Sequence, residues 1–509
     1  MKAADAADYV LGVVGAGAMG QGIVQVAAMG GIRVLLQDAR DGGAKAWRDA
    51  VAARINRLEE KGRIDPDAAA AAIARIEPVN GMPDLASADA VVEAVFEDLD
   101  VKQQVFAALE GVVGPECILA SNTSSIPIAA IARACKHPSR VAGLHFFNPV
   151  PLMKLVEVIR AAETTEAVVA ALTTLGRRMT RTPVTVKDRP GFLVNLGGRA
   201  FTTEGLRIAH DGIATPAQID AIMRDCWGFR MGPFELMDLT GIDVNYPVSQ
   251  IVWDGYQCDP RLATSPNHKA MFDAGLFGRK TGKGWYTYDG GKPVDPPSPD
   301  HDSGAEPVQR VALVPGAEAG REALAELCDT LGIDVITDDG GCTLLGDAGG
   351  PAPGRDASHA AVMAGVDAAR LVCVDLMGDT SRRMTLMTAP GADAAHLGGV
   401  AAAIAASGRK VTAINDSPGF VGPRLCAMIA NLGCFMAEIA LADPEDIDMA
   451  MELGLNYPAG PLKLASDMGP ANVLAIMQAL QEVTGDPRYR PTPWLRRRAM
   501  LGLAIHTRP

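Results

Sequence analysis

Cysteine, basic residues and long uncharged apolar runs are all scarce in this sequence of 509 residues, and each scarcity excludes a class of protein. The nine cysteines are scattered, odd in number and never spaced as Cys-x-x-Cys, which argues against a disulfide framework or a thiolate zinc site. No metal site is therefore expected, and a reducing cytoplasmic location fits this use of cysteine.

Basic residues are outnumbered by acidic ones, 47 against 60, which gives a formal net charge of −13. Nucleic acids and anionic membranes bind basic surfaces, so neither is expected as a partner. The one long uncharged stretch, residues 10–32, is rich in glycine and contains Gln21 and Gln25, so it would make a poor membrane-spanning helix. The leader before it is acidic, unlike a secretory signal. We expect a soluble, cytoplasmic protein.

The order of the sequence patterns predicts several domains, because single hydrophobic cores seldom exceed ~250–300 residues. Over residues 1–189, β-branched runs alternate with helical patterns, which predicts a Rossmann-like α/β domain with a mostly parallel sheet. Residues 190–288 predict a helical domain, with one helix over 192–210 and another from a Thr215 cap to Trp227. Residues 289–307, dense in proline, glycine and aspartate, predict a flexible linker.

After the linker the pattern starts again. Pro190-Gly191-Phe192 recurs as Pro418-Gly419-Phe420, 228 residues later, and the same offset relates Asp220 to Asp448 and Gly232-Pro233 to Gly460-Pro461. A constant offset indicates a tandem duplication. We predict a degenerate, partial Rossmann-like domain over residues 308–416 and a second helical domain over residues 417–509.

A glycine motif marks a candidate dinucleotide site. Gly15, Gly17 and Gly20 form a GxGxxG that follows a predicted strand and opens a predicted helix, as pyrophosphate-binding turns do. Asp38 ends the next strand 18 residues after Gly20, near the spacing of about 20 expected for a ribose-binding acid. A carboxylate there accepts from both ribose hydroxyls and repels a 2′-phosphate, so NAD rather than NADP is the expected cofactor.

A histidine and a glutamate mark the candidate reacting centre. His145 closes a predicted strand and Glu157 lies twelve residues later on another. A histidine backed by a carboxylate can take a proton from an alcohol while hydride leaves the same carbon. Taken alone, His145 is more simply a hydrogen-bonded core histidine, so its neighbours in the sequence decide the interpretation.

Those neighbours resemble the L-3-hydroxyacyl-CoA dehydrogenase family. The motifs VVEAVFEDLDVK, SNTSS, HFFNPVPLMKLVEV and PGFLVN are similar to that family's in order and spacing over residues 10–288. The resemblance implies a dinucleotide-binding domain followed by a helical domain. It also implies oxidation of the C3 hydroxyl of an L-3-hydroxyacyl-CoA to the 3-ketoacyl-CoA by NAD, the chemistry of fatty-acid β-oxidation.

The resemblance further implies roles for single residues. His145 would be the base and Glu157 its orienting partner, while Asn195 would polarise the substrate carbonyl. Ser124 would lie between substrate and nicotinamide, Asn148 would contact both, and Lys61 would contact coenzyme A. The other implied cofactor contacts are Glu97, Lys102, Asn122 and Lys280.

Two departures bear on these expectations. Gly197 and Gly198 follow Asn195 near the start of a predicted helix, where glycine costs roughly 1 kcal/mol relative to alanine. In the second copy, Pro315 and Ala317 replace the first two glycines of the motif and Glu318 adds a negative charge. At the 228-residue offset, Cys373, Leu376, Thr385 and Pro423 replace His145, Asn148, Glu157 and Asn195. One active site per chain is expected.

The substrate stays open at this level. Short acyl groups such as 3-hydroxybutyryl-CoA are the first expectation, and 3-hydroxyadipyl-CoA of aromatic-acid breakdown is the alternative that the resemblance implies. A non-catalytic dinucleotide-binding protein on the same fold is a further alternative, as is a β-hydroxyacid dehydrogenase with a lysine catalyst, although the HFFNP motif disfavours the latter. No hydratase-like segment precedes residue 10, so a multifunctional β-oxidation chain is not expected.

The second copy has a structural role in this interpretation. Its helical domain keeps Pro418-Gly419-Phe420 and Gly460-Pro461 while its catalytic positions have changed. We expect the domain to pack on residues 190–288 as a built-in partner, in the manner of a dimer, with a higher oligomer left open.

Overall fold

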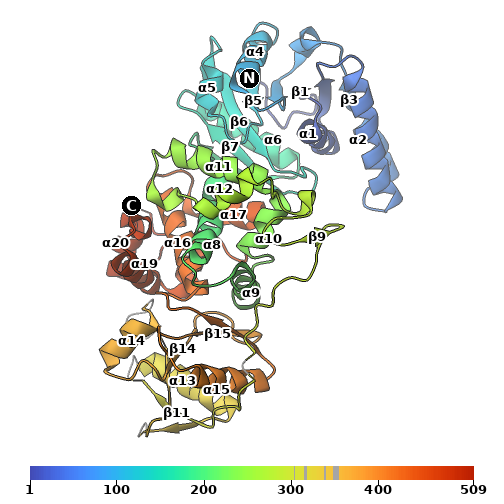
Figure 1. Cartoon of the computed structure of the whole chain (residues 1–509). Helices are drawn as coiled ribbons and strands as arrows, with labels where there is room; N and C mark the ends of the chain where they lie inside the picture. Colours follow the sequence, from blue (N-terminus) through green and yellow to red (C-terminus); the bar gives the residue numbers. More distant parts are fainter. Residues whose placement is uncertain (303, 315–317, 338–339, 348–354, 509) are drawn as a thin grey trace. The chain divides into compact units, whose positions relative to one another are not determined.

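The computed structural model describes residues 1–302, 304–314, 318–337, 340–347 and 355–508. It divides into two compact units (Figure 1), each made of segments distant in the sequence. The first unit contains Met1–Leu196 and Ala440–Leu455, and the second contains Gly197–Ile439 and Asn456–Pro509. A segment of the second sequence repeat therefore belongs to the unit that carries the glycine motif.

The first unit is built on an eight-stranded sheet in the order β3-β2-β1-β4-β5-β6-β7-β8. All neighbouring strands run parallel except β6 and β7, which are antiparallel. This arrangement confirms the predicted Rossmann-like class, in which buried parallel strands read as continuous apolar runs. The strands are β1 (Val10–Val14), β2 (Arg33–Gln37), β3 (Ile76–Pro78), β4 (Ala90–Glu93), β5 (Ile118–Ser121), β6 (Val141–Phe146), β7 (Leu155–Arg160) and β8 (Thr182–Lys187).

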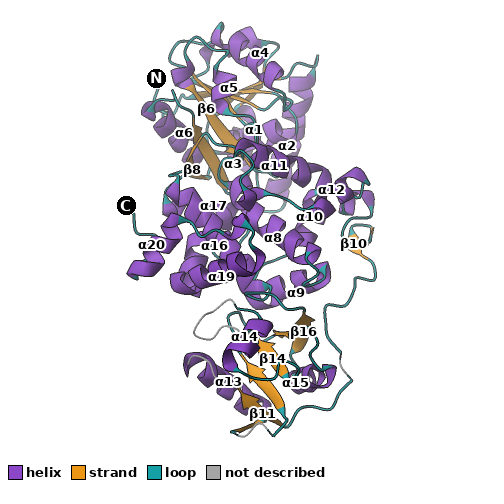
Figure 2. Ribbon diagram, turned by 60° about the vertical axis from the view of Figure 1, so that its left-hand side comes forward, coloured by secondary structure: helices purple, strands orange, loops and turns teal. Residues whose placement is uncertain are grey.

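Helices cover this sheet on both faces (Figure 2) and bury its apolar side chains in one core. Several begin at side-chain caps: Asp65, Asp98 and Thr165 each accept a backbone N–H from the first turn. The helices that precede Gly197 are α1 (Ala18–Met29), α2 (Gly43–Glu60), α3 (Pro66–Ala74), α4 (Leu99–Glu110), α5 (Ile128–Ala132) and α6 (Glu166–Arg178).

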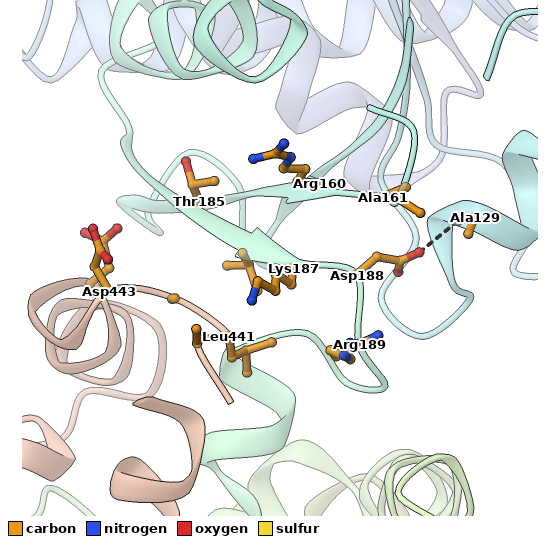
Figure 3. A pocket seen from close by; sticks show the side chains of 14 residues that line it. Ala129, Arg160, Ala161, Thr185, Lys187, Asp188, Arg189, Leu441 and Asp443 are labelled. Carbon is orange, nitrogen blue, oxygen red and sulfur yellow. Dashed lines mark hydrogen bonds between the residues drawn. The ribbon is translucent and has the colours of Figure 1, made fainter. Parts of the chain in front are cut away.

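One more helix of this unit comes from the far end of the chain. Helix α17 (Pro444–Leu455) packs on β7 and β8, and the Lys187 N–H donates to the Leu441 carbonyl at 2.9 Å. Beside this junction lies a cavity of about 510 Å³ (Figure 3), where Asp188 accepts the N–H groups of Ile128 and Ala129 at the start of α5. The segment after Ile439 therefore completes the outer edge of the first sheet.

The second unit contains the helices of both sequence repeats. From the first repeat come α8 (Arg199–His210), α9 (Pro216–Trp227), α10 (Pro233–Thr240), α11 (Ile242–Gly255) and α12 (Pro266–Asp273). From the second come α16 (Gly422–Glu438), α18 (Pro461–Met468), α19 (Pro470–Thr484) and α20 (Pro493–Leu501). The predicted Thr215 cap is present, with Thr215 Oγ1 accepting the Gln218 N–H at 3.3 Å.

The prediction of a single helix over residues 192–210 is wrong. Phe192 has a φ of +47°, so the helix begins only at α7 (Val194–Gly197), and a break at Gly198 separates α7 from α8. Gly197 and Gly198 explain the break, because glycine loses more backbone entropy in a helix than any other residue and so destabilises it. In the second repeat, where Cys426 lies at the position of Gly198, α16 runs unbroken.

The second unit also holds a smaller sheet, of six described strands in the order β12-β11-β13-β14-β15-β16. Strands β14 and β15 are antiparallel, as β6 and β7 are, which confirms a partial Rossmann-like copy. The substituted loop at Pro315 and Ala317 lies outside the described residues. The elements are β11 (Arg310–Leu313), α13 (Glu318–Leu331), β12 (Asp334–Ile336), β13 (Thr343–Gly346), α14 (Ala357–Ala364), β14 (Leu371–Val374), β15 (Arg383–Met387), α15 (Ala394–Ala406) and β16 (Lys410–Ile414).

The segment expected to be a flexible linker is partly held by this smaller domain. It begins with a short hairpin of β9 (Tyr288–Asp289) and β10 (Lys292–Pro293). Further on, the buried Arg383 guanidinium binds the Asp300 carboxylate at 2.8 Å, and the His301 N–H donates to the Val411 carbonyl at 2.8 Å. These contacts attach residues 300–301 to β15 and β16.

Candidate active site

The glycine motif forms the turn between β1 and α1. Gly15 has a φ of +95°, and a Cβ there would lie 2.7 Å from the Ala94 carbonyl oxygen. A Cβ at Gly20 would lie 1.9 Å from the Gly15 carbonyl oxygen, so Gly20 allows the helix to approach the turn. A Cβ at Gly17 would meet nothing within 4 Å, which leaves open space in front of the first turn of α1. The turn therefore fits a pyrophosphate group.

Asp38 lies just after β2 and shares its carboxylate between the glycine turn and a neighbouring arginine. Its Oδ2 accepts the Ala16 N–H at 3.0 Å, and its Oδ1 accepts from the Arg40 N–H at 3.0 Å and the Arg40 Nε at 2.9 Å. The hydrogen bond from the Arg40 guanidinium lowers the pKa of Asp38, although partial burial opposes the shift. Asp38 is therefore ionised at neutral pH, with Arg40 exposed beside it.

A buried ion pair lies below the loop that follows β4. The Lys102 Nζ binds Glu93 Oε1 at 2.7 Å and Glu97 Oε2 at 3.3 Å, and the Lys102 and Glu93 side chains are 1% and 0% exposed. Sequence reasoning gave Glu97 and Lys102 a cofactor role but missed Glu93. The only signal in the sequence was weak, a single charged residue at the end of the otherwise apolar strand β4.

Glu93 and Glu97 together order the loop after β5. Glu93 Oε2 accepts the Ser121 hydroxyl at 2.6 Å, and Ser121 Oγ in turn accepts the Thr123 N–H at 3.2 Å. Glu97 Oε1 accepts the Thr123 hydroxyl at 2.6 Å and the Ser124 N–H at 3.1 Å. Burial raises the pKa of Glu97, but these hydrogen bonds and the Lys102 charge outweigh it, so the net shift is downward. The loop is thus fixed by two carboxylates.

His145 and Glu157 occupy directly opposed positions on β6 and β7. The Nδ1 of His145 lies 2.6 Å from Glu157 Oε2, and the two residues are 6% and 0% exposed. The other oxygen, Glu157 Oε1, accepts the N–H groups of Leu193 and Val194 at 3.1 and 2.9 Å, where α7 begins. Both carboxylate oxygens are therefore hydrogen-bonded, as a buried carboxylate requires.

Two amide side chains join the loops around this pair. The Asn122 Oδ1 accepts the Phe146 N–H at 2.8 Å, which connects the loop after β5 to the strand that carries His145. The Asn195 Nδ2 donates to the Ser124 carbonyl at 3.2 Å, which connects the same loop to α7. The first unit thus brings Ser124, Asn195 and the His145–Glu157 pair into one hydrogen-bonded group.

Three other residues singled out from the sequence are exposed. Asn148 is exposed after β6, and Lys61 is exposed at the end of α2. Lys280 belongs to the second unit, in the 3-10 turn η4 (Arg279–Thr281), where it forms an ion pair with Asp243. None of the residues with expected catalytic roles lines the cavity beside α17.

The strand pairing of the second copy corrects one assignment. The constant offset made Cys373 the counterpart of His145, but Cys373 pairs with Met387 across β14 and β15. The Asp375 N–H donates to the Thr385 carbonyl at 3.0 Å, so Asp375 lies opposite Thr385 as His145 lies opposite Glu157. The pairing is displaced by two residues relative to the first sheet. Burial raises the pKa of Asp375 to about 7.

The nine cysteines are all free thiols. Among the residues described, no helix is both long and apolar enough to cross a membrane.

Comparison with known proteins finds two family models on this chain. The NAD-binding domain of 3-hydroxyacyl-CoA dehydrogenase matches residues 10–189. The C-terminal domain of 3-hydroxyacyl-CoA dehydrogenase matches twice, over residues 191–288 and 419–504. The two matches of the C-terminal model cover the helices of the two sequence repeats, α8 to α12 in the first and α16 to α20 in the second.

Individual relatives agree with these models. A 3-hydroxyadipyl-CoA dehydrogenase of Escherichia coli K12 is 35% identical over 96% of this chain and 97% of its own length. A probable 3-hydroxybutyryl-CoA dehydrogenase of Deinococcus radiodurans is 39% identical over 54% of this chain and 99% of its own. The crystal structure of a 3-hydroxybutyryl-CoA dehydrogenase from E. coli K12 superposes with a TM-score of 0.84 at 34% identity, covering 97% of this chain and 98% of that one.

Proposed function

This chain belongs to the 3-hydroxyacyl-CoA dehydrogenase family, whose members are NAD-dependent oxidoreductases, and we propose that it oxidises the C3 hydroxyl of an L-3-hydroxyacyl-CoA to a ketone. The observation that carries the proposal is the buried His145–Glu157 pair, with 2.6 Å between Nδ1 and Oε2. Reduction of the 3-ketoacyl-CoA is the same reaction in reverse.

His145 is the general base in this proposal. Because the Glu157 carboxylate only accepts hydrogen bonds, His145 carries its proton on Nδ1 and keeps Nε2 as an acceptor. Nε2 takes the hydroxyl proton as the C3–H bond breaks and the carbonyl forms. Glu157 stabilises the resulting imidazolium, while the Leu193 and Val194 N–H groups hold the carboxylate in place.

Ser124 and Asn195 orient the substrate in this proposal, with Asn148 completing the contacts. The hydrogen bond from the Asn195 amide to the Ser124 backbone carbonyl supports a common location for these two residues. Lys61, at the end of α2, is the proposed coenzyme A contact. Lys280 stays a proposed cofactor contact from the resemblance alone.

The residues of the first unit that would hold NAD are the glycine turn and the acids beside it. Gly15, Gly17 and Gly20 would cradle the pyrophosphate, and Asp38 would accept from the adenosine ribose. The pair of Glu97 and Lys102, with Asn122, would bind the nicotinamide half. Bound NAD supplies the hydride acceptor.

The acyl group is proposed to be short. The relative that covers almost the whole chain is named for 3-hydroxyadipyl-CoA and the superposed crystal structure for 3-hydroxybutyryl-CoA, so the two candidates differ in a terminal carboxylate. Measurement of kcat/KM for 3-hydroxybutyryl-CoA, 3-hydroxyhexanoyl-CoA and 3-hydroxyadipyl-CoA separates them. A preference for the C6 dicarboxylate over the uncharged C6 substrate identifies the 3-hydroxyadipyl assignment.

NADH formation from any of these substrates tests the reaction itself. His145→Gln is the variant that should slow it by roughly 10²–10⁴. His137→Gln, at an exposed histidine of the same unit, is the matched control and should leave the rate unchanged. Failure of the native chain to reduce NAD with all three substrates would contradict the proposed reaction.

We propose further that residues 190–288 and 417–509 are helical domains that act as permanent partners within one chain. Their helices α8 and α16 pack together in the second unit, which supports this role. Truncation after residue 290 is expected to expose the face of α8 and to cause aggregation or self-association. A monodisperse, active monomer would contradict this role. The nine free thiols support a cytoplasmic location.

A further inference from the structure

The two sequence repeats make reciprocal contacts. The Lys187 N–H of the first repeat donates to the Leu441 carbonyl of the second at 2.9 Å. The Asn415 N–H of the second repeat donates to the Ile213 carbonyl of the first, also at 2.9 Å. Each bond is the other displaced by 228 residues with the repeats exchanged. Such exchange is the defining property of an isologous interface between two like subunits.

The reciprocity extends to a pair of arginines. Both repeats contain the sequence Asp-Pro-Arg in a 3-10 turn, η3 (Pro260–Leu262) in the first and η5 (Pro487–Tyr489) in the second. Arg261 of the first repeat lies over the Phe435 ring of α16, 4.1 Å from its centroid. Arg488 of the second repeat instead approaches the Glu204 carboxylate of α8 at 3.5 Å. The positions correspond, but their partners differ in charge.

Glu204 is the centre of this difference. It is 0% exposed, and its Oε1 accepts the Arg424 Nε at 2.7 Å and the Tyr489 hydroxyl at 3.0 Å. Arg424 is itself buried, with Nη1 donating to Ser417 Oγ at 3.0 Å and Nη2 to Tyr489 Oη at 2.7 Å. The carboxylate comes from the first repeat and both of its close donors come from the second.

The positions that correspond to Glu204, Arg424 and Tyr489 when the two repeats are exchanged carry uncharged side chains. At the 228-residue offset, Glu204 corresponds to Leu432 and Arg424 to Leu196, and both leucines are buried. In the Asp-Pro-Arg turns, Tyr489 corresponds to Leu262. One end of an otherwise reciprocal interface is therefore ionic while the other is apolar.

From this one-sided arrangement we infer that the Glu204–Arg424 pair makes the helical interface selective for unlike halves. The face of α8 accepts the second repeat of the chain and rejects the first repeat of another molecule. Two first repeats packed together would bury two Glu204 carboxylates, each facing Leu196 and Leu262 instead of Arg424 and Tyr489. The nearest cation left would be Arg261, the counterpart of Arg488, which lies 3.5 Å from Glu204 against 2.7 Å for Arg424. Loss of the closest charged partner of a buried carboxylate opposes association strongly.

This inference rests on the proposed partnership of the two helical domains and is independent of the proposed reaction, since neither residue belongs to the catalytic group. It also refines the truncation experiment, because it favours aggregation of residues 1–290 over an ordered dimer.

A test with full-length chains uses charge reversal on separate molecules. Glu204→Arg places two arginines together within one chain, and Arg424→Glu places two glutamates together within the other. When the two variants are co-expressed with different affinity tags, exchange of halves restores both ion pairs. We expect each variant alone to have a lowered Tm, and the co-expressed pair to purify through both tags as a 1:1 complex by native mass spectrometry with its Tm restored.

The control reverses an exposed pair on α18, Lys463 and Asp467, as Lys463→Glu and Asp467→Lys on separate chains. These two variants should keep the native Tm and should not co-purify, because solvent-exposed pairs contribute little. Absence of a mixed complex from the Glu204→Arg and Arg424→Glu chains, or a mixed complex of equal yield from the control chains, would overturn the inference. NADH formation in the same samples reports separately on the proposed reaction.

Discussion

His145 and Glu157 face each other across the one antiparallel pair of strands in the first sheet, with 2.6 Å between Nδ1 and Oε2. Antiparallel pairing places the two side chains on the same face and directly opposite. A turn of eight residues between β6 and β7 is therefore sufficient to assemble a histidine–carboxylate pair that lies at the end of a buried sheet.

Replacement of His145 by glutamine should lower kcat by roughly 10²–10⁴, the range of a lost general base, while the Kd for NADH stays nearly unchanged. Glu157→Gln should slow the same step by less, because the base remains but loses its orienting charge. Stopped-flow kinetics and NADH titration measure the two effects. Loss of NADH binding with an unaffected chemical step would show that His145 supports the fold instead.

Asp38 should decide the choice of dinucleotide. Its ionised carboxylate repels a 2′-phosphate, so kcat/KM with NAD should exceed that with NADP by at least ~10²-fold, about 2.7 kcal/mol. Asp38→Ala should lower the ratio of kcat/KM with NAD to kcat/KM with NADP. The substitution removes the repulsion of the 2′-phosphate and leaves the exposed Arg40 without its carboxylate partner. Equal use of the two dinucleotides by the native chain would remove the basis of this assignment.

Glu93→Gln should destabilise the first unit and raise KM for NAD together. The substitution keeps the size of the side chain but leaves the buried Lys102 without its closest carboxylate, a change that costs about 3–5 kcal/mol in comparable buried pairs. The loop from Asn122 to Ser124 should loosen because Ser121 loses a charged acceptor. Glu77→Gln, which breaks an exposed pair with Arg33, is the control and should change stability by less than about 1 kcal/mol. A normal KM in Glu93→Gln would separate the ion pair from cofactor binding.

His268 should make the second unit sensitive to mild acid. Burial lowers its pKa to about 3, and its ring nitrogens lie 2.8 Å from Thr264 Oγ1 and 2.6 Å from Asn245 Oδ1. An unfolded histidine has a pKa near 6.5, so the unfolded chain binds more protons between pH 6.5 and 3, and stability falls as the pH falls through that window. From pH 7 to pH 5 the loss is about 2 kcal/mol.

The control for this prediction is an exposed histidine. His268→Gln should lower stability at pH 7 but flatten its decline toward pH 5, whereas His137→Gln should change neither. Urea unfolding of the two variants at both pH values measures the effect. An unchanged decline in His268→Gln would mean that another group controls acid unfolding.

Local patterns were sufficient for much of the fold. The expected strands of the first sheet rest on apolar runs, and the Thr215 cap rests on turn residues, both of which depend on neighbours in the chain. The duplication rests on a constant offset that is visible in the sequence itself. The break at Gly198 was harder to predict, because helix propensity alone does not decide whether a glycine pair interrupts a helix or is tolerated within it. Glu93 was missed because a single acid at a strand end is ordinary until its buried lysine is known.

The sequence by itself therefore determined the sheet and the glycine turn, since each follows from residue types at short spacing. His145 was singled out as the candidate base by the family resemblance of its flanking motifs. Only the tertiary structure decided that Asp375 lies opposite Thr385, because strand register depends on the pairing of whole strands and not on a sequence offset. It also decided that α17 completes the edge of the first sheet and that Glu204 lies against Arg424, 220 residues away. Contacts at such separations arise from the packing of complete domains, which local sequence patterns do not encode.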